Sequence, residues 1–250
     1  MIEAQMAPKT TVPAKDRLII ALDVETADEA QRIVRETAQF AGAFKIGLQM
    51  FASEGPRFVS ELCAAGHKIF LDLKFHDIPN TVAKAGVEAA RLGVWMFNIH
   101  ALGGNEMMHG CVSEVGNFCQ SANISRPKII AVTVLTSSSD DTLREIGIEA
   151  KADEEVLRLA KLADSAGLDG VVASARETKL VRQSCGDNFL IVTPGIRPSD
   201  ASNNDQQRVM TPADAVRAGA DHLVVGRPIA SATDMSAAAE KILNEIASAL

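Results

Sequence analysis

Two carboxylates and a lysine lie close together in the stretch Ile69–Thr81. In an extended segment Asp72 and Lys74 fall on one face, and the apolar residues between and beside them fall on the other. Asp77 follows shortly before Pro79, which ends the strand and opens the next helix. Lone buried charges are costly, so these side chains must be paired within the protein. The spacing Asp-x-Lys-x-x-Asp therefore indicates a catalytic charge cluster.

Two further charged residues close apolar runs earlier in the chain. Asp23 ends the run Leu-Ile-Ile-Ala-Leu-Asp, and Lys45 lies inside Ala-Phe-Lys-Ile-Gly-Leu. Together with Asp72, Lys74 and Asp77 they are expected to form an alternating network, in which each charge stabilises its neighbours. The alternative is a purely structural ring of ion pairs in the protein core.

The end of the chain carries the pattern of an anion site. Gly226 follows an apolar strand pattern and lets the backbone approach a phosphate closely, while Arg227 adds a forked cation next to a predicted helix start. Arg197 offers a second cation from the preceding strand. The segment from there to Met210 is long and polar and contains Gln206. We expect this segment to be a closing lid; the alternative is a solvated loop.

The remaining polar candidates give weaker signals. A lone histidine such as His100, near a strand end, is more often hydrogen-bonded packing than a base. Thr136 follows a strand pattern, where its hydroxyl would reach a substrate base or sugar. The sequence has neither Cys-x-x-Cys spacing nor a His-x-His pair at any strand end, so a metal ion has little support.

Apolar, β-branched runs alternate with helical patterns along the chain, without a break in composition that would indicate a linker. Uninterrupted alternation predicts a parallel sheet with helices outside, and eight units in a chain of this length fit an α/β fold of the (β/α)8 barrel type. A doubly wound open sheet is the alternative, but no Gly-x-Gly-x-x-Gly follows the first strand. We expect one barrel domain over 17–250 and a loose leader over 1–16. The predicted strands are Leu18–Asp23, Ala43–Leu48, Lys68–Lys74, Trp95–His100, Lys128–Val134, Gly170–Ala173, Phe189–Thr193 and Asp221–Val225; the predicted helices include Ala27–Ala38, Val82–Leu92, Glu154–Ala166 and Ala213–Ala218.

Composition limits the class of partner. The 250 residues carry a formal net charge of −7 and no tyrosine, which argues against nucleic acid and against an anionic membrane surface. No apolar run approaches the ~20 residues of a membrane span. The four cysteines show no pairing pattern, so we expect reduced thiols in a cytoplasmic protein.

The order of these motifs resembles the orotidine 5'-phosphate decarboxylase family in its bacterial form, from about Leu18 to the final helix. The matching segments are 21–23, 44–47, 71–81, 98–101, 134–137, 193–198 and 225–228. The resemblance implies conversion of orotidine 5'-phosphate to uridine 5'-phosphate, the last step of de novo pyrimidine synthesis, without metal or organic cofactor.

By position, the resemblance makes Lys74 the proton donor to the ring carbon that loses CO2. Asp72 and Asp77 then flank it, and Lys45 completes the charged network. In relatives the residue matching Asp77 reaches across a dimer interface, so a homodimer is implied here. Further implied contacts with the substrate come from Asp23 at the ribose, Thr136 beside the pyrimidine, Ile78 and Thr81, and Arg197, Gln206, Gly226 and Arg227 at the phosphate and lid.

Two rival interpretations remain open at this point. One is another sugar-phosphate barrel enzyme, such as a metal-dependent keto-gulonate phosphate decarboxylase or a pentose-phosphate epimerase. The other is a nucleotide-binding protein without turnover, although every charged group that the reaction needs is present.

Overall fold

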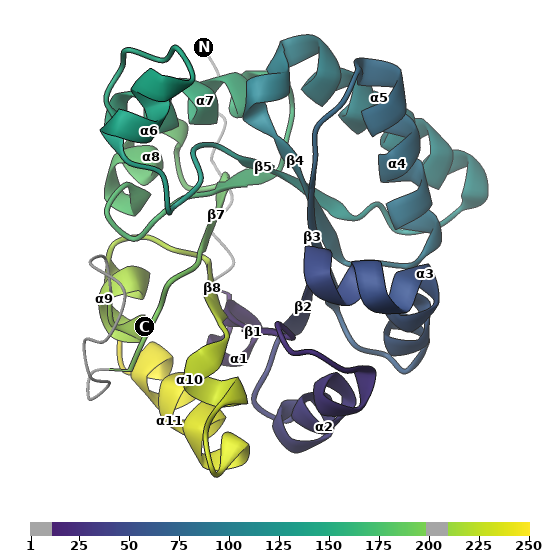
Figure 1. The fold of residues 1–250 in the computed structure, drawn as a ribbon, viewed down its shortest axis with the longest axis vertical. Coiled ribbons are helices and arrows are strands. Elements are labelled where there is room, and N and C mark those ends of the chain that lie inside the picture. Colours follow the sequence, from purple (N-terminus) through teal and green to yellow (C-terminus); the bar gives the residue numbers. More distant parts are fainter. Residues whose placement is uncertain (1–11, 199–209) are drawn as a thin grey trace, which may run out of the picture.

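The computed structural model describes residues 12–198 and 210–250, and within these residues eight parallel strands close into one barrel in sequence order (Figure 1). The strands are β1 Leu18–Ala21, β2 Ala43–Gly47, β3 Ile69–Phe75, β4 Met96–His100, β5 Lys128–Val132, β6 Gly170–Val172, β7 Leu190–Thr193 and β8 His222–Val225. Because β8 pairs in parallel with β1, the sheet has no open edge. The predicted (β/α)8 barrel is confirmed, and the doubly wound open sheet is wrong.

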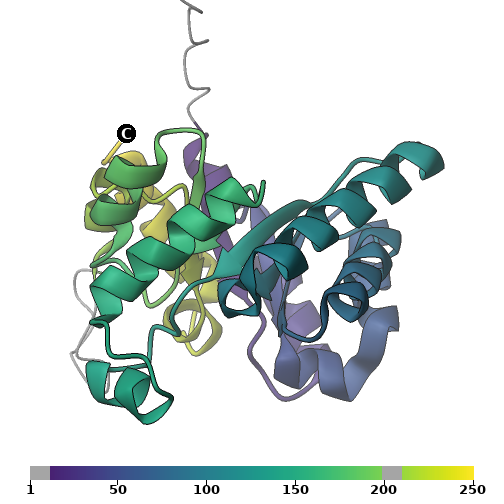
Figure 2. The same ribbon diagram turned by 90° about the horizontal axis from the view of Figure 1, so that it is seen from above.

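Helices connect the strands and surround the barrel, as Figures 1 and 2 show from two directions. They are α1 Ala14–Arg17, α2 Ala27–Thr37, α3 Leu48–Ala64, α4 Pro79–Arg91, the 3-10 turn η1 Ala101–Gly103, α5 Gly104–Ala122, α6 Asp140–Glu145, α7 Ala152–Ser165, α8 Thr178–Cys185, α9 Pro212–Arg217, α10 Arg227–Ala230 and α11 Met235–Ala247. The helix predicted from Val82 begins earlier, because Pro79 occupies the first helical position, where its missing N–H costs nothing. Within the described ranges, no helix combines the length and apolar character of a membrane span.

The leader predicted over residues 1–16 lies mostly outside the described residues. Its last residues are part of α1, so the predicted boundary at residue 17 falls inside a helix. This short helix is tied to β8, because Nδ1 of His222 lies 2.9 Å from the carbonyl oxygen of Asp16. Arg17 also donates to the carbonyl oxygen of Ala220 at 2.9 Å. These contacts join α1, which begins before residue 17, to the barrel.

Two apolar layers result from the alternation of side chains along the strands. One layer fills the barrel interior, and the other packs between the strands and the helices. On β3, for example, Phe70 belongs to the inner layer, while Ile69 and Leu71 belong to the outer one. The inner layer consists of Ile19, Ala21, Ala43, Phe70, Met96, Ile130, Val192 and Val224.

Two aspartates, the half-buried Asp169 and the buried Asp221, join neighbouring strands at the amino-terminal end of the barrel. Asp169, just before β6, accepts a hydrogen bond from the backbone N–H of Ile129 at 2.7 Å. Asp221, just before β8, does the same for Ile191 at 2.9 Å and is also paired with Arg182. Each carboxylate thus satisfies the N–H of the second residue of the preceding strand, which would otherwise be buried without a partner.

We expect Asp221→Ala to lower the free energy of unfolding by about 3–5 kcal/mol, because it leaves the Arg182 guanidinium without its counter-ion and a buried strand N–H without its acceptor. Denaturant unfolding measures this change. Glu61→Ala is the control, since Glu61 pairs with Arg57 on the exposed surface of α3 and should cost about 0.5 kcal/mol or less. Equal losses in the two variants would contradict the role given to Asp221.

Candidate active site

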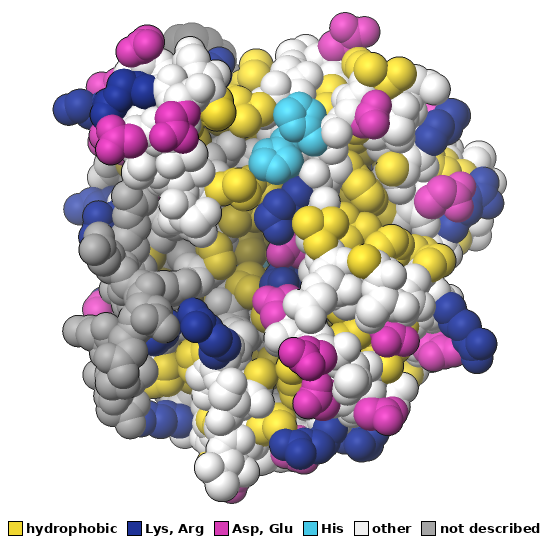
Figure 3. Space-filling view, in the orientation of Figure 1, with side chains coloured by type: hydrophobic (Ala, Val, Ile, Leu, Met, Phe, Trp, Pro, Cys, Tyr) yellow, Lys and Arg dark blue, Asp and Glu magenta, His cyan; other side chains and the backbone are white. Residues whose placement is uncertain are grey.

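A cavity of about 440 Å³ opens at the carboxyl ends of the strands. Figure 3 shows it as a hollow in which basic and acidic side chains alternate along one wall above an apolar floor. This end of a (β/α)8 barrel is where its enzymes carry their catalytic groups. The charged and hydroxyl-bearing residues that line it are Asp23, Lys45, Asp72, Lys74, Thr136, Arg197 and Arg227.

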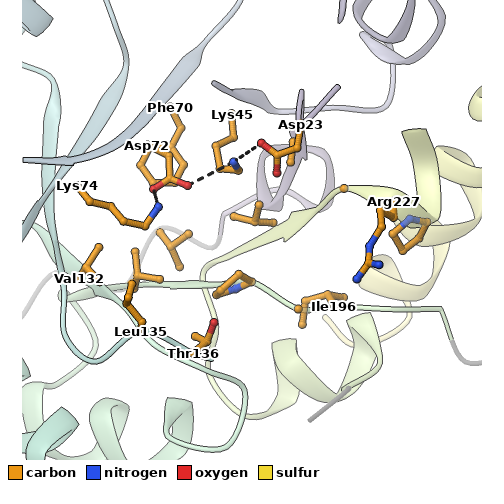
Figure 4. A pocket seen from close by; sticks show the side chains of 18 of the residues that line it. Asp23, Lys45, Phe70, Asp72, Lys74, Val132, Leu135, Thr136, Ile196 and Arg227 are labelled. Atoms are coloured by element: carbon orange, nitrogen blue, oxygen red, sulfur yellow. Dashed lines mark hydrogen bonds and ion pairs between the residues drawn. The ribbon is translucent and has the colours of Figure 1, made fainter. Parts of the chain in front are cut away.

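Four of the predicted charges form one continuous chain of contacts. Nζ of Lys45 lies 2.8 Å from Oδ1 of Asp23 and 3.3 Å from Oδ2 of Asp72. Nζ of Lys74 lies 2.7 Å from Oδ1 of Asp72. The side chain of Lys45 is only 9% exposed, whereas that of Lys74 is 31% exposed and faces the cavity (Figure 4). Lys74, at the end of this series of contacts, is therefore the more accessible of the two lysines that line the cavity.

Adjacent strands bring these residues together. In the parallel ladders Ala21 lies opposite Lys45, and Gly47 lies opposite Asp72. A Cβ atom at Gly47 would lie 3.1 Å from Oδ1 of Asp23 and 3.2 Å from Nζ of Lys45. Glycine at this position thus leaves room for the ion pair between Asp23 and Lys45.

Asn98 on β4 belongs to the same cluster, although sequence reasoning gave it no role. Its Nδ2 donates to Oδ1 of Asp72 at 2.7 Å, and its Oδ1 accepts from the backbone N–H of Lys74 at 2.8 Å. Asn98 is fully buried. The available signal was an amide two residues before His100, on an inward-facing position of an otherwise apolar strand.

Two arginines line the cavity away from the lysines. Arg227 is the first residue of α10 and directly follows Gly226; Figure 4 places it across the cavity from Lys74. Arg197 follows β7, and its backbone N–H donates to the carbonyl oxygen of Met210 at 3.2 Å. Apolar residues such as Ile196 lie between the two charged ends, so a ligand can present an anion to the arginines and an apolar ring to the middle.

The structure does not bring every predicted residue into this cavity. Asp77 lies outside it, and its Oδ1 accepts from the backbone N–H of Ile78 at 2.6 Å. Ile78 and Thr81 are also exposed and outside the cavity of this chain. Of the five charges expected in the network, four are therefore in contact within one polypeptide. Gln206 lies outside the described residues.

His100 lies at the end of β4 beside the charge cluster. Its ring is 5.3 Å from that of His76, and its Nδ1 is buried without a hydrogen-bond partner among the described residues. Burial lowers the pKa of His100, and the neighbouring His76 and Lys74 lower it further. The imidazole is therefore neutral near pH 7. In the described part of the chain, no group of three or more His, Cys, Asp or Glu side chains is arranged to hold a metal ion.

The fold and the cavity together define a (β/α)8-barrel enzyme with a lysine–carboxylate centre and two arginines in the same cavity. Residues 16–242 match the model of the orotidine 5'-phosphate decarboxylase / HUMPS family. The chain is 54% identical to orotidine 5'-phosphate decarboxylase of Syntrophotalea carbinolica over 96% of this chain and 98% of that protein. It is also 54% identical to the Geobacter sulfurreducens protein of the same name, over 93% of this chain and 97% of that protein.

A solved structure supports the same relationship. The orotidine 5'-phosphate decarboxylase of Lactobacillus acidophilus superposes with a TM-score of 0.81 at 39% sequence identity, covering 92% of this chain and 98% of the other. The chain therefore belongs to the orotidine 5'-phosphate decarboxylase family. The predicted family and enzyme class are confirmed.

We expect inorganic phosphate to stabilise the protein by binding between the two arginines. At ten times its Kd it would add about 1.4 kcal/mol to the free energy of unfolding, which raises Tm by about 3–6 °C for a chain of this size. Thermal unfolding in phosphate and in chloride of equal ionic strength measures the difference. Arg227→Ala should abolish it, whereas Arg57→Ala on the exposed surface of α3 should not; the same shift in chloride would contradict the site.

Proposed function

We propose that this protein decarboxylates orotidine 5'-phosphate to uridine 5'-phosphate, the last step of de novo pyrimidine synthesis, without metal or organic cofactor. The observation that carries the proposal is the Asp72–Lys74 pair, which faces a cavity whose far side holds Arg197 and Arg227. The relatives that share about half of its residues carry this activity in their names.

Lys74 is the proposed proton donor. When the bond between the ring and the carboxylate breaks, the electron pair stays on a ring carbon that has no adjacent carbonyl to delocalise it. An ammonium group held beside that carbon stabilises the developing carbanion without solvent reorganisation. It then transfers a proton to the carbon and is reprotonated from water, which reaches its partly exposed side chain.

The neighbouring charges of Asp72 and Lys45 hold Lys74 in position. Asp72 contacts Nζ of Lys74 at 2.7 Å, and Lys45 offsets the remaining charge of Asp72 from the other side. Asp72 also faces the space that the substrate carboxylate would enter. Repulsion there would destabilise the bound substrate more than the transition state, in which the carboxylate leaves as neutral CO2.

The other lining residues are proposed to orient the substrate. The phosphate would lie at Arg197, Gly226 and Arg227, the pyrimidine beside Thr136, and the ribose hydroxyls at Asp23, whose side chain is 57% exposed. Gln206 stays a predicted phosphate contact. Enzymes lower barriers by about 8–23 kcal/mol, more than one ion contact supplies. Binding energy from the distant phosphate must therefore contribute to alignment at Lys74.

We propose further that the active form is a homodimer with composite sites. Asp77, Ile78 and Thr81 lie on the outer side of the cavity rim, where they can reach a second subunit. Apolar side chains are exposed in three successive βα connections: Leu48 at 61%, Ile78 at 66% and Leu102 at 40%. Figure 3 shows hydrophobic side chains gathered on this side of the opening. An apolar rim of this kind is typical of a protein interface, and Asp77 would then complete the charge network of the partner's site.

The cytoplasm is the proposed location. All four cysteines are free thiols, which suits a reducing compartment. Burial raises the pKa of Cys111 to about 12 and that of Cys63 to about 11, so neither thiol is activated as a nucleophile.

Lys74→Ala should lower kcat by at least ~10²-fold, because both the proton donor and the stabilising cation are lost. The measurement is the loss of orotidine 5'-phosphate absorbance in the presence of EDTA. Lys179→Ala, at an exposed position on α8, is the control and should match the wild type. An inactive wild type, an unimpaired Lys74→Ala variant or inhibition by EDTA would overturn the proposal.

For the composite sites, Asp77→Ala and Lys74→Ala chains should each be inactive alone and recover activity when mixed. A heterodimer then holds one site with both residues intact, so full subunit exchange restores about a quarter of the sites. Asp72→Ala mixed with Lys74→Ala is the matched control, since both residues belong to the same cavity, and it should restore nothing. No recovery despite demonstrated heterodimers would count against Asp77 acting across the interface.

A further inference from the structure

The backbone of Lys74 departs from regular strand geometry. Its φ is 55°, in the left-handed region that a residue with a side chain rarely adopts. The ladder between β3 and β4 shifts at the same place: Leu71 pairs with Phe97, but the next pair is Phe75 with Ile99. Between these two pairs β3 therefore advances by four residues, whereas β4 advances by two. The β-bulge turns the Lys74 side chain toward the cavity and takes its N–H out of the regular ladder.

Asn98, which lies on β4 inside this shift, supplies the missing partner. Its Oδ1 accepts from the N–H of Lys74 at 2.8 Å, and its Nδ2 donates to Oδ1 of Asp72 at 2.7 Å. That same Asp72 oxygen accepts from Nζ of Lys74 at 2.7 Å. One fully buried amide therefore holds both the main chain of the lysine and the carboxylate that orients its ammonium.

The chemistry at this position is specific to an amide. A backbone N–H can only donate and an ionised carboxylate can only accept, so the amide has one orientation that satisfies both. An aspartate would accept from the N–H but repel Asp72, and an apolar side chain would leave the N–H buried without a partner.

We infer that Asn98 is a positioning residue, which sets the geometry of the Asp72–Lys74 pair without touching the substrate itself. The inference rests on the proposed function, since the geometry it maintains is that of the proton donor. The cations for the phosphate lie elsewhere in the cavity, on the segments after β7 and β8. Loss of Asn98 should therefore change the chemical step and leave substrate binding nearly intact.

The test compares Asn98→Asp with Asn98→Leu, two substitutions of similar size. Both should lower kcat about 10²-fold at pH 7.5, with KM within about threefold of the wild type. In Asn98→Asp the new carboxyl can take up a proton at lower pH and donate to Asp72 as the amide did. Its kcat relative to the wild type should therefore rise between about pH 7.5 and pH 5.5. Asn98→Leu cannot donate and should show no such recovery.

A control variant and a smaller replacement of Asn98 distinguish a positioning role from an effect on folding. Thr37→Val removes a fully buried hydroxyl that donates to the carbonyl oxygen of Ile33 in α2, outside the residues that line the cavity. It should lower Tm without altering the pH profile of kcat. If Asn98→Asp or Asn98→Leu does not fold, Asn98→Ser is the smaller replacement, with the same expected loss in kcat and retained binding of uridine 5'-phosphate by calorimetry.

The outcomes distinguish this inference from the proposed function. A wild type that does not decarboxylate orotidine 5'-phosphate would overturn the function itself. An active wild type with Asn98 variants of unchanged kcat would overturn only the inference. The same holds if the activity of Asn98→Asp follows its folded fraction at every pH.

Discussion

The carboxylate of Asp72 is the interaction on which the rest of the site depends. It is 14% exposed, and it contacts Lys45 and Lys74 as well as the amide of Asn98. Removing a charge of this kind from water costs several kcal/mol, and only well-placed partners offset that cost. The partners come from β2, β3 and β4, so their register cannot change without leaving a buried charge unpaired. The same contacts of Asp72 thus fix the active-site geometry and stabilise this part of the barrel.

The closed barrel satisfies this constraint by keeping its polar and apolar parts apart. An apolar inner layer fills the lower barrel, and the charged side chains lie above it at the carboxyl ends of the strands. The paired lysines and carboxylates lie on or just after β1, β2 and β3, whereas Arg197 and Arg227 follow β7 and β8, and Figure 4 places Arg227 across the cavity from Lys74. A chain with a net charge of −7 can therefore still present a locally cationic site to a phosphate.

Much of this arrangement could be predicted from the sequence. Apolar, β-branched runs located the strands, their alternation with helical patterns indicated a closed barrel, and polar residues at the strand ends identified Asp23, Lys45, Asp72 and Lys74 as neighbours. Asp77 was predicted to join the same network, but it follows the end of β3 at Phe75 and lies outside the cavity of its own chain. Asn98 received no role, because an uncharged residue within an apolar strand resembles ordinary packing until its hydrogen bonds are known.

The sequence by itself determined which chemical groups exist and which strand ends carry them, because alternation and strand-breaking residues act over a few neighbouring positions. The tertiary structure decided how those groups meet. The left-handed backbone of Lys74, the register shift beside it and the two hydrogen bonds of Asn98 appear only when β3 and β4 pair. Residues separated by 24 and 26 positions make these contacts, and no local pattern encodes a distance between strands.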